Sequence, residues 1–271
     1  MDHTPHPYVH GRSDREAERL HYQASKLAEL LHQGIHYPRG DLVLEAACGV
    51  GAQTVILARN NPEARIVSVD IYPESLVIAK ERVVEGGISN VTFCQADVYH
   101  LPFGLNTFNH VFVCFLLEHL PHPLLALQQL KEVLQPGGTI TVIEGDHGST
   151  LFYPESERAQ LVIQSLIDLQ RLMGGNSLIG RELFPLVKRA GFSSVRVVPC
   201  QVYADESRPE YGEGVKKIFI AMIEGVRKQV LARDLIDEET WEIGISDLYR
   251  TAGPGGVFSY TFFKASAEKT E

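Results

Sequence analysis

The residues best suited to chemistry begin with a glycine loop, Glu45-Ala-Ala-Cys-Gly49-Val-Gly51-Ala. Glycines let a backbone approach a ligand closely, and the helix that follows offers free N–H groups to an anion. Asp70 comes roughly twenty residues later, where a carboxylate can accept hydrogen bonds from both ribose hydroxyls. Asp97, after the next apolar segment, can accept a hydrogen bond from the amine of adenine. The pattern predicts an adenosine-containing ligand; the alternative for Asp70 is a carboxylate at the N-terminus of the next helix.

A second polar run, Gly145-Asp146-His147-Gly148, follows the apolar segment 139–143. If that segment is a strand, its carboxyl end faces the ligand cleft of an open α/β sheet. Asp146 and His147 are then candidate catalytic residues. His147 is the candidate general base, because a neutral imidazole with an unperturbed pKa accepts a proton at physiological pH. The alternative is a loop in which Asp146 caps the next turn.

The elements that must position these residues alternate between strands and helices. This rhythm is typical of a parallel sheet with helices on both faces and right-handed crossovers. A helix with Ser13 as its N-cap and Glu16 completing a capping box is expected before them. Strands are expected at 42–45, 65–70, 91–94, 109–115, 139–143, 195–203 and 257–264, and helices at 12–33, 53–59, 73–84, 124–134, 156–173 and 181–190, with a helical stretch at 209–250.

Composition narrows the class of protein. The formal net charge of -9 over 271 residues disfavours a nucleic-acid partner, because phosphate binding needs a basic face. The N-terminus has no apolar signal core and no apolar run is long enough for a membrane span, so a cytoplasmic protein is expected. The four cysteines are scattered, and no spacing of His, Cys and carboxylates predicts a metal site. The oligomeric state cannot be predicted from these features.

Taken in order, five segments resemble the motifs of class I S-adenosylmethionine-dependent methyltransferases. The resemblance is nearest to the ubiquinone- and menaquinone-biosynthesis type and to related small-molecule methyltransferases, and it covers residues 40–145 plus the final two strands. It implies a Rossmann-like α/β fold: a doubly wound, mostly parallel seven-stranded sheet with an antiparallel last strand and a helical insertion. It also implies in-line transfer of a methyl group from S-adenosyl-L-methionine to a small organic acceptor. The segments are Glu45–Ala52, Asp70, Ala96-Asp97, Phe115–Leu120 and Leu134–Gly138.

The resemblance further implies which residues surround the cofactor. One departure concerns Ala47, where the family usually has glycine; alanine is small and fits this loop if its φ is negative, so the departure bears on cofactor affinity and not on the fold. The implied set is Glu45, Ala47, Gly49 and Gly51 beside the methionine part, Asp70 at the ribose, Ile71, Asp97 and Val98 at adenine, Phe115 near the sulfonium, and Tyr8 in an N-terminal lid.

We expect three parts: an N-terminal lid and helix at 1–36, a cofactor-binding core at 37–150, and an acceptor-side half at 151–271 with the insertion at about 205–255.

Two other functions stay open. One is a binding module that keeps the cofactor pocket without turnover. The other is a nicotinamide-dependent oxidoreductase, which is disfavoured because Thr54 stands where a dinucleotide fingerprint has its third glycine. Candidates to line the acceptor pocket, with ordinary core as the alternative, are Phe152, Tyr153, Met173, Phe219 and Met222.

Overall fold

The chain is built around a seven-stranded β-sheet with the strand order β3-β2-β1-β4-β5-β7-β6. The structure, a computed structural model, describes residues 8–11 and 13–270. The strands from β3 to β5 in this order pair in parallel, whereas β7 runs antiparallel to both β5 and β6. The predicted fold class is therefore confirmed. The strands are β1 (Leu42–Ala46), β2 (Arg65–Asp70), β3 (Val91–Gln95), β4 (Phe108–Cys114), β5 (Leu134–Tyr153), β6 (Ser193–Ala204) and β7 (Val257–Glu268).

Strand β1 lies where the strand order reverses, with β2 on one side and β4 on the other. Its residues 43–46 are all buried, because helices cover both faces of the sheet. Ligands of open α/β sheets bind at such a reversal, outside the carboxyl ends of the strands. The loops that follow β1, β2 and β4 are therefore the expected location of a site.

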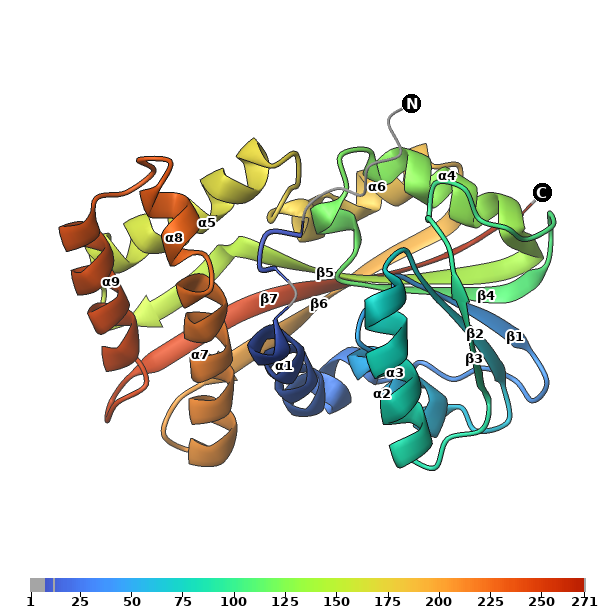
Figure 1. Cartoon of the computed structure of the whole chain (residues 1–271), viewed down its shortest axis with the longest axis horizontal. Coiled ribbons are helices and arrows are strands. Elements are labelled where there is room, and N and C mark those ends of the chain that lie inside the picture. The colour runs from blue at the N-terminus through green and yellow to red at the C-terminus, as the bar shows by residue number, and fades with distance from the viewer. Residues whose placement is uncertain (1–7, 12, 271) are drawn as a thin grey trace.

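Helices cover the sheet on both faces (Figure 1). α4 and α6 pack together on one face, and α1, α2 and α7 pack on the other. α5 packs against α8 and α9 at the end of the sheet farthest from β3. The helices are α1 (Asp14–His32), α2 (Ala52–Asn60), α3 (Pro73–Glu85), α4 (Pro123–Val133), α5 (Glu157–Leu172), α6 (Leu183–Arg189), α7 (Pro209–Glu224), α8 (Arg227–Leu231) and α9 (Glu238–Arg250), with short 3₁₀ turns η1 (Leu117–His119) and η2 (Ile179–Glu182).

The helical stretch predicted at 209–250 forms as three helices, α7 to α9, between β6 and β7. α7 ends at Gly225, whose missing side chain weakens helix propagation. α9 starts afresh at Asp237, whose carboxylate accepts a hydrogen bond from the N–H of Thr240 at 2.8 Å. The break lets α7 pack against both α1 and β6, so the insertion contributes one wall of the interior.

Strand β5 is much longer than the predicted segment 139–143, because the antiparallel strand β7 pairs with it along most of its length. The ladder runs from Thr139 to Asp146 and resumes at Leu151. His147 therefore lies in an irregular stretch, where its backbone N–H donates to the carbonyl of Ser177 instead of to β7. This interruption frees the side chain of His147 from the regular alternation of the strand.

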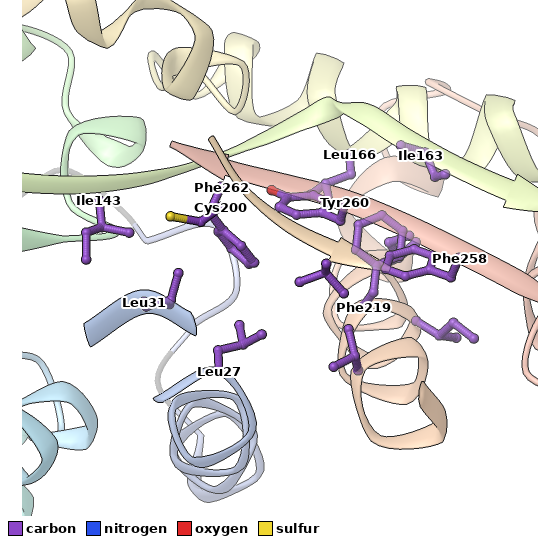
Figure 2. Packing of buried hydrophobic residues seen from close by; sticks show 14 of the residues in the cluster. Leu27, Leu31, Ile143, Ile163, Leu166, Cys200, Phe219, Phe258, Tyr260 and Phe262 are labelled. Carbon is purple, nitrogen blue, oxygen red and sulfur yellow. The ribbon is translucent and has the colours of Figure 1, made fainter. Parts of the chain in front are cut away.

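Aromatic side chains of β7 form much of the core between the sheet and α7. Figure 2 shows Phe258 and Tyr260 of β7 grouped with Phe219 of α7. The ring of Phe219 lies 5.0 Å from that of Phe258 and 5.7 Å from that of Tyr260, between centroids. Such offset aromatic contacts make a rigid, apolar wall.

The N-terminal helix α1 begins as predicted at Ser13, whose Oγ accepts from the N–H of Glu16 at 3.2 Å. The expected capping box is not completed. The Glu16 carboxylate instead accepts from the hydroxyl of Tyr8 at 2.9 Å and from both sides of the Arg19 guanidinium at 2.7 Å. The first turn of α1 is thus tied to the segment before it. Within the described residues, no helix is long and apolar enough to span a membrane.

Candidate active site

A cavity of about 680 Å³ opens at the carboxyl ends of the central strands. Its walls come from the loops after β1, β2, β3 and β4, from α1 and α7, and from the inner face of β7. Volumes of this order are typical of small-molecule sites. The cavity therefore joins the predicted cofactor region to the region around β7 in one continuous space.

The glycine loop forms one end of this cavity. Gly49 and Gly51 have φ values of +52° and +77°, in the left-handed region that favours glycine. A Cβ on Gly51 would lie 2.9 Å from the Cα of Ala79 in α3, whereas a Cβ on Gly49 would meet nothing within 4 Å. Gly49 therefore leaves its backbone open toward the cavity, while Gly51 packs against α3 and does not line the wall.

Asp70, at the end of β2, holds the glycine loop in place. One carboxylate oxygen accepts from the N–H of Gly49 at 2.8 Å, and the other accepts from the N–H of Tyr72 at 2.9 Å. The side chain is buried and lines the cavity. The carboxylate thus orders the loop as well as facing the predicted ribose position.

Ala47 does not meet the condition of a negative φ under which alanine fits this loop without strain. Its φ is +56°, so an alanine occupies the left-handed conformation in which glycine is the usual residue. Phe115, which follows β4, has a φ of +57°. Both residues line the cavity. Left-handed backbone costs a residue with a side chain about 1–2 kcal/mol, and such strain tends to collect at functional sites.

Glu45 is fully buried at the end of β1, and it accepts a hydrogen bond of 2.6 Å from the hydroxyl of Ser68. Burial raises the pKa of this carboxyl to about 7, against the opposing effect of its hydrogen bond with Ser68. Glu45 therefore changes charge near neutral pH at the edge of the cavity.

The residues predicted to contact adenine, Ile71, Asp97 and Val98, also line the cavity. Asp97 accepts from the N–H of Tyr99 at 2.9 Å and lies 3.3 Å from the ring of His100. Ile71 and Val98 line the cavity beside it. All the predicted cofactor residues except Gly51 therefore line the same cavity, and their individual roles remain predictions.

At the other end of the cavity, His147 is buried and lines the wall. Its Nδ1 lies 2.8 Å from the hydroxyl of Tyr260, and its Nε2 is buried without a hydrogen-bond partner among the described residues. The pKa of His147 is lowered by burial, which outweighs the opposite effect of the nearby Glu118 carboxylate. The imidazole is therefore neutral near pH 7, and its pKa is not the unperturbed value that we assumed.

Asp146 does not line the cavity, contrary to the predicted contact with the acceptor. Its buried carboxylate accepts two hydrogen bonds of 2.7 Å from the Arg181 guanidinium and one of 3.0 Å from the N–H of Gly148. These contacts turn Asp146 toward Arg181 and away from the cavity that His147 lines. The carboxylate caps the turn at Gly148, which was the alternative reading of this segment.

The start of the described chain covers the cavity. Tyr8 lies edge-on to the ring of His119, with centroids 4.8 Å apart, and also lines the cavity. The carbonyl of Val9 accepts a hydrogen bond of 2.6 Å from Gln229 of α8. Of the predicted N-terminal lid, Tyr8, His10 and Gly11 line the cavity, while residues 1–7 and 12 lie outside the described residues. Its action as a lid stays a prediction.

The sequence analysis did not predict several of the residues that line the cavity. Tyr260 and Phe262 belong to an alternating aromatic strand, and that alternation is the signal that they share one face. Glu118 lies within the segment Phe115–Leu120 but was assigned no role there; its carboxyl is buried in the middle of the η1 turn, and burial raises its pKa. Of the five candidates for the acceptor pocket, Phe219 and Met222 line the cavity and the other three do not.

Comparisons with known proteins agree with this architecture. Residues 39–183, just over half of the chain, match the sequence profile of a family described as "Methyltransferase domain". An uncharacterised methyltransferase of Schizosaccharomyces pombe is 34% identical over 149 residues, covering 53% of this chain and 53% of that protein. A ubiquinone/menaquinone biosynthesis C-methyltransferase of Cellvibrio japonicus is 31% identical over 153 residues, covering 50% of this chain and 61% of that protein.

The fold is also that of solved methyltransferases. The phosphoethanolamine N-methyltransferase 2 of Haemonchus contortus, in complex with phosphomonomethylethanolamine and S-adenosylhomocysteine, superimposes with a TM-score of 0.54. The sequences are 19% identical, and the similarity covers 91% of this chain and 52% of that one. The chain spans only about half to three-fifths of the length of the first two curated relatives described above.

Proposed function

The chain belongs to the methyltransferase domain family, and from that premise we propose that it transfers a methyl group from S-adenosyl-L-methionine to a small organic acceptor. The observation that carries the proposal is the single cavity of about 680 Å³, which has the glycine loop and Asp70 at one end and an aromatic chamber with His147 at the other. A donor and an acceptor can meet only if they share such a space.

The residues at the glycine-loop end fit S-adenosylmethionine. The backbone of Gly49 has open space beside it, and the Asp70 carboxylate is fixed next to it by the N–H groups of Gly49 and Tyr72. Asp97 lies farther along the same wall, at the place proposed for adenine. Thr54 is fully buried in α2 and occupies the position where a dinucleotide fingerprint has glycine, which favours S-adenosylmethionine over a nicotinamide cofactor.

S-adenosylmethionine supplies an electrophilic methyl group on a sulfonium. What the chain must add is alignment of the acceptor for in-line transfer, which in favourable cases contributes about 7–11 kcal/mol of barrier lowering. Phe115, held at the end of β4 in its left-handed conformation, faces the cavity between the two ends. Its ring is suited to stabilise a passing cation by about 1 kcal/mol. Tyr8, His10, Gly11 and α1 form part of the wall that would shield this space from water.

Binding and turnover test this proposal separately. Isothermal calorimetry with S-adenosylhomocysteine and with NADH should show binding of the first and not of the second. Incubation with S-adenosylmethionine and a metabolite library should then release S-adenosylhomocysteine. Binding of NADH in preference would contradict the proposal, and binding of S-adenosylhomocysteine without release by any acceptor would favour a binding module.

A further inference from the structure

The cavity wall contains a buried carboxylate whose polar partners are distant. Glu118, in the η1 turn, is 8% exposed and lines the cavity. Among the described residues, its carboxylate oxygens lie 3.5 Å from Nε2 of Gln170 and 3.6 Å from Nε2 of His119. Both distances exceed the length of about 2.7–2.9 Å that is usual for a charge-assisted hydrogen bond. A buried carboxylate is costly unless it is paired, so we expect a group of the ligand to pair with it.

The backbone around Glu118 is fixed from two sides. Two backbone N–H groups at the start of the turn donate to the buried carboxylate of Glu144, in β5, at 3.0 and 2.7 Å. The backbone carbonyl of Glu118 accepts a hydrogen bond of 3.0 Å from the side-chain amide of Gln170, in α5. Because a strand and a helix both hold this turn, the carboxylate has a set position in the cavity wall.

The same short segment holds Glu118 beside His147. The N–H of Asn176 donates to the carbonyl of Glu118 at 2.8 Å, and the carbonyl of the next residue, Ser177, accepts from the N–H of His147 at 2.9 Å. The ring of His147 lies 2.8 Å from the hydroxyl of Tyr260, between Nδ1 and Oη. Burial raises the pKa of that hydroxyl, and the negative charge of Glu118 raises it further. Glu118 therefore belongs to the aromatic end of the cavity.

The charges around Glu118 leave room for one more positive charge. Among the residues that the structure describes, Arg19 is the one Lys or Arg side chain that lines the cavity. Its guanidinium donates to both carboxylate oxygens of Glu16 at 2.7 Å, so its charge is already matched. Glu144 adds a second buried carboxyl, and its Oε2 has no hydrogen-bond partner within the described part of the chain. A cationic ligand group would therefore meet an unmatched negative charge at Glu118.

The rest of this end fits an apolar body that carries one polar group. The rings of Phe219, Phe258 and Phe262 line it. Nε2 of His147 is buried without a hydrogen-bond partner among the described residues, so a polar group of the ligand is expected there. A cation beside a carboxylate and among aromatic rings is stabilised by both. A hydroxyl would leave the charge of Glu118 unmatched, and an anion would be repelled.

We propose that Glu118 binds the protonated amino group of an otherwise apolar acceptor, as an ion pair at the aromatic end of the cavity. This proposal rests on the proposed function, and it names the acceptor class as an apolar amine. Glu118 follows Phe115 by three residues, so the charged group lies toward the methyl donor and the apolar body extends between α7 and β7. The ion pair orients the acceptor whichever of its atoms receives the methyl group.

The first test uses three matched probes, 1-naphthylmethylamine, 1-naphthylmethanol and 1-naphthoate, titrated by calorimetry into the S-adenosylhomocysteine complex at pH 7.5. The amine is a cation at this pH and should bind at least about tenfold more tightly than the alcohol. The carboxylate should bind most weakly, because its charge has the same sign as that of Glu118. Equal binding of the three, absence of binding, or preference for the alcohol or the carboxylate contradicts the proposal.

The second test removes the charge and keeps the shape of the side chain. In Glu118→Gln, the preference for the amine over the alcohol should fall below about threefold, while affinity for the alcohol should change by less than about twofold. Glu63→Gln, at an exposed side chain, is the matched control and should keep the full preference. A preference for the amine that survives unchanged in Glu118→Gln overturns the proposal.

Affinity for S-adenosylhomocysteine separates this inference from the proposed function. Glu118→Gln should bind that ligand within about twofold of the unsubstituted protein, which also shows that the variant is folded. A loss of about tenfold or more, with thermal stability retained, would mean that Glu118 serves the cofactor and would overturn the proposal. If S-adenosylhomocysteine fails to bind the unsubstituted protein, the proposed function fails; if it binds but the probes do not discriminate, only this inference fails.

Discussion

The two ends of the cavity are constructed differently. At the glycine-loop end, polar groups from consecutive elements bind each other: Asp70 accepts from Gly49, and Glu45 accepts from Ser68. At the aromatic end, the central contact joins His147 to Tyr260, which are 113 positions apart in sequence. The first end depends on backbone conformation and local spacing, whereas the second depends on how distant elements pack.

This difference predicts that the two ends respond independently to substitution. Changes in the glycine loop should alter stability and cofactor affinity together, because the same groups hold the loop and face the ligand. Changes at the aromatic end should leave cofactor affinity nearly unchanged. Substitutions more than about 7–10 Å apart without shared partners are usually additive, which makes independence measurable.

The largest loss of stability is expected from Gly51→Ala. The new Cβ would lie 2.9 Å from the backbone of Ala79 in α3, and φ is +77°. Left-handed strain and overpacking together should lower the free energy of unfolding by about 2–5 kcal/mol. Gly49→Ala is the matched control, because its φ is also positive but its Cβ meets nothing, and it should cost about 1–2 kcal/mol. Equal losses in urea denaturation would show that packing on α3 is unimportant.

The next largest effect is the pH dependence that Glu45 gives to the free energy of unfolding. Its pKa is raised to about 7 in the folded protein, so folding favours the protonated form. The associated stability is fully present below about pH 4 and is lost as the pH rises through about 7, a change of about 3 kcal/mol. Glu45→Gln should remove this loss, so the variant should gain stability relative to the original protein between pH 5 and pH 8.

Urea denaturation at those two pH values measures the difference. Glu63→Gln, at an exposed side chain, is the control and should show no such change. A Glu45→Gln variant whose stability falls with pH in parallel with the original protein would mean that Glu45 does not titrate in this range.

Asp70→Ala should weaken binding of S-adenosylhomocysteine at least tenfold, because charge-assisted hydrogen bonds are worth about 1.5–3 kcal/mol. The same variant loses the bonds to Gly49 and Tyr72, so it should also be less stable. Asp97→Asn keeps an acceptor oxygen and should have the smaller effect on affinity. If calorimetry shows a larger loss of affinity for Asp97→Asn than for Asp70→Ala, our assignment of the two carboxylates is reversed.

Tyr260→Phe should cost about 1–2 kcal/mol of stability, because the buried Nδ1 of His147 loses its partner. Affinity for S-adenosylhomocysteine should change by less than about twofold, since this contact lies at the aromatic end. Parallel thermal melts and calorimetry test both statements. A loss of affinity comparable to that of Asp70→Ala would contradict the independence of the two ends.

The smallest effect is expected from Ala47→Gly. Glycine adopts a φ of +56° without strain, but it also increases the entropy of the unfolded chain. The two effects oppose each other, and a net gain of up to about 1 kcal/mol is expected. Ala46→Gly in β1 is the contrasting variant, because this strand residue has nothing to gain and should lose stability. A loss in both variants would show that the strain at Ala47 is not relieved by glycine.

The sequence by itself determined the α/β class, the alternation of the elements, and the wall that contains Gly49, Asp70 and Asp97. These features are visible because each depends on residues that are close in sequence: an apolar run makes a strand, and the residue after it lies at the strand's carboxyl end. The parallel order of the sheet then brings the ends of consecutive strands together without further information. The positions of the predicted cofactor residues follow from that geometry.

Tertiary structure decided the rest. The direction of Asp146 depends on Arg181, and the hydrogen bond at Nδ1 of His147 depends on Tyr260. The positive φ of Ala47 cannot be read from its identity, because alanine normally avoids that conformation. Side-chain direction, hydrogen bonding and backbone strain at these residues are set by partners from distant parts of the chain. Those partners meet only when the antiparallel strand β7 closes the sheet beside β5.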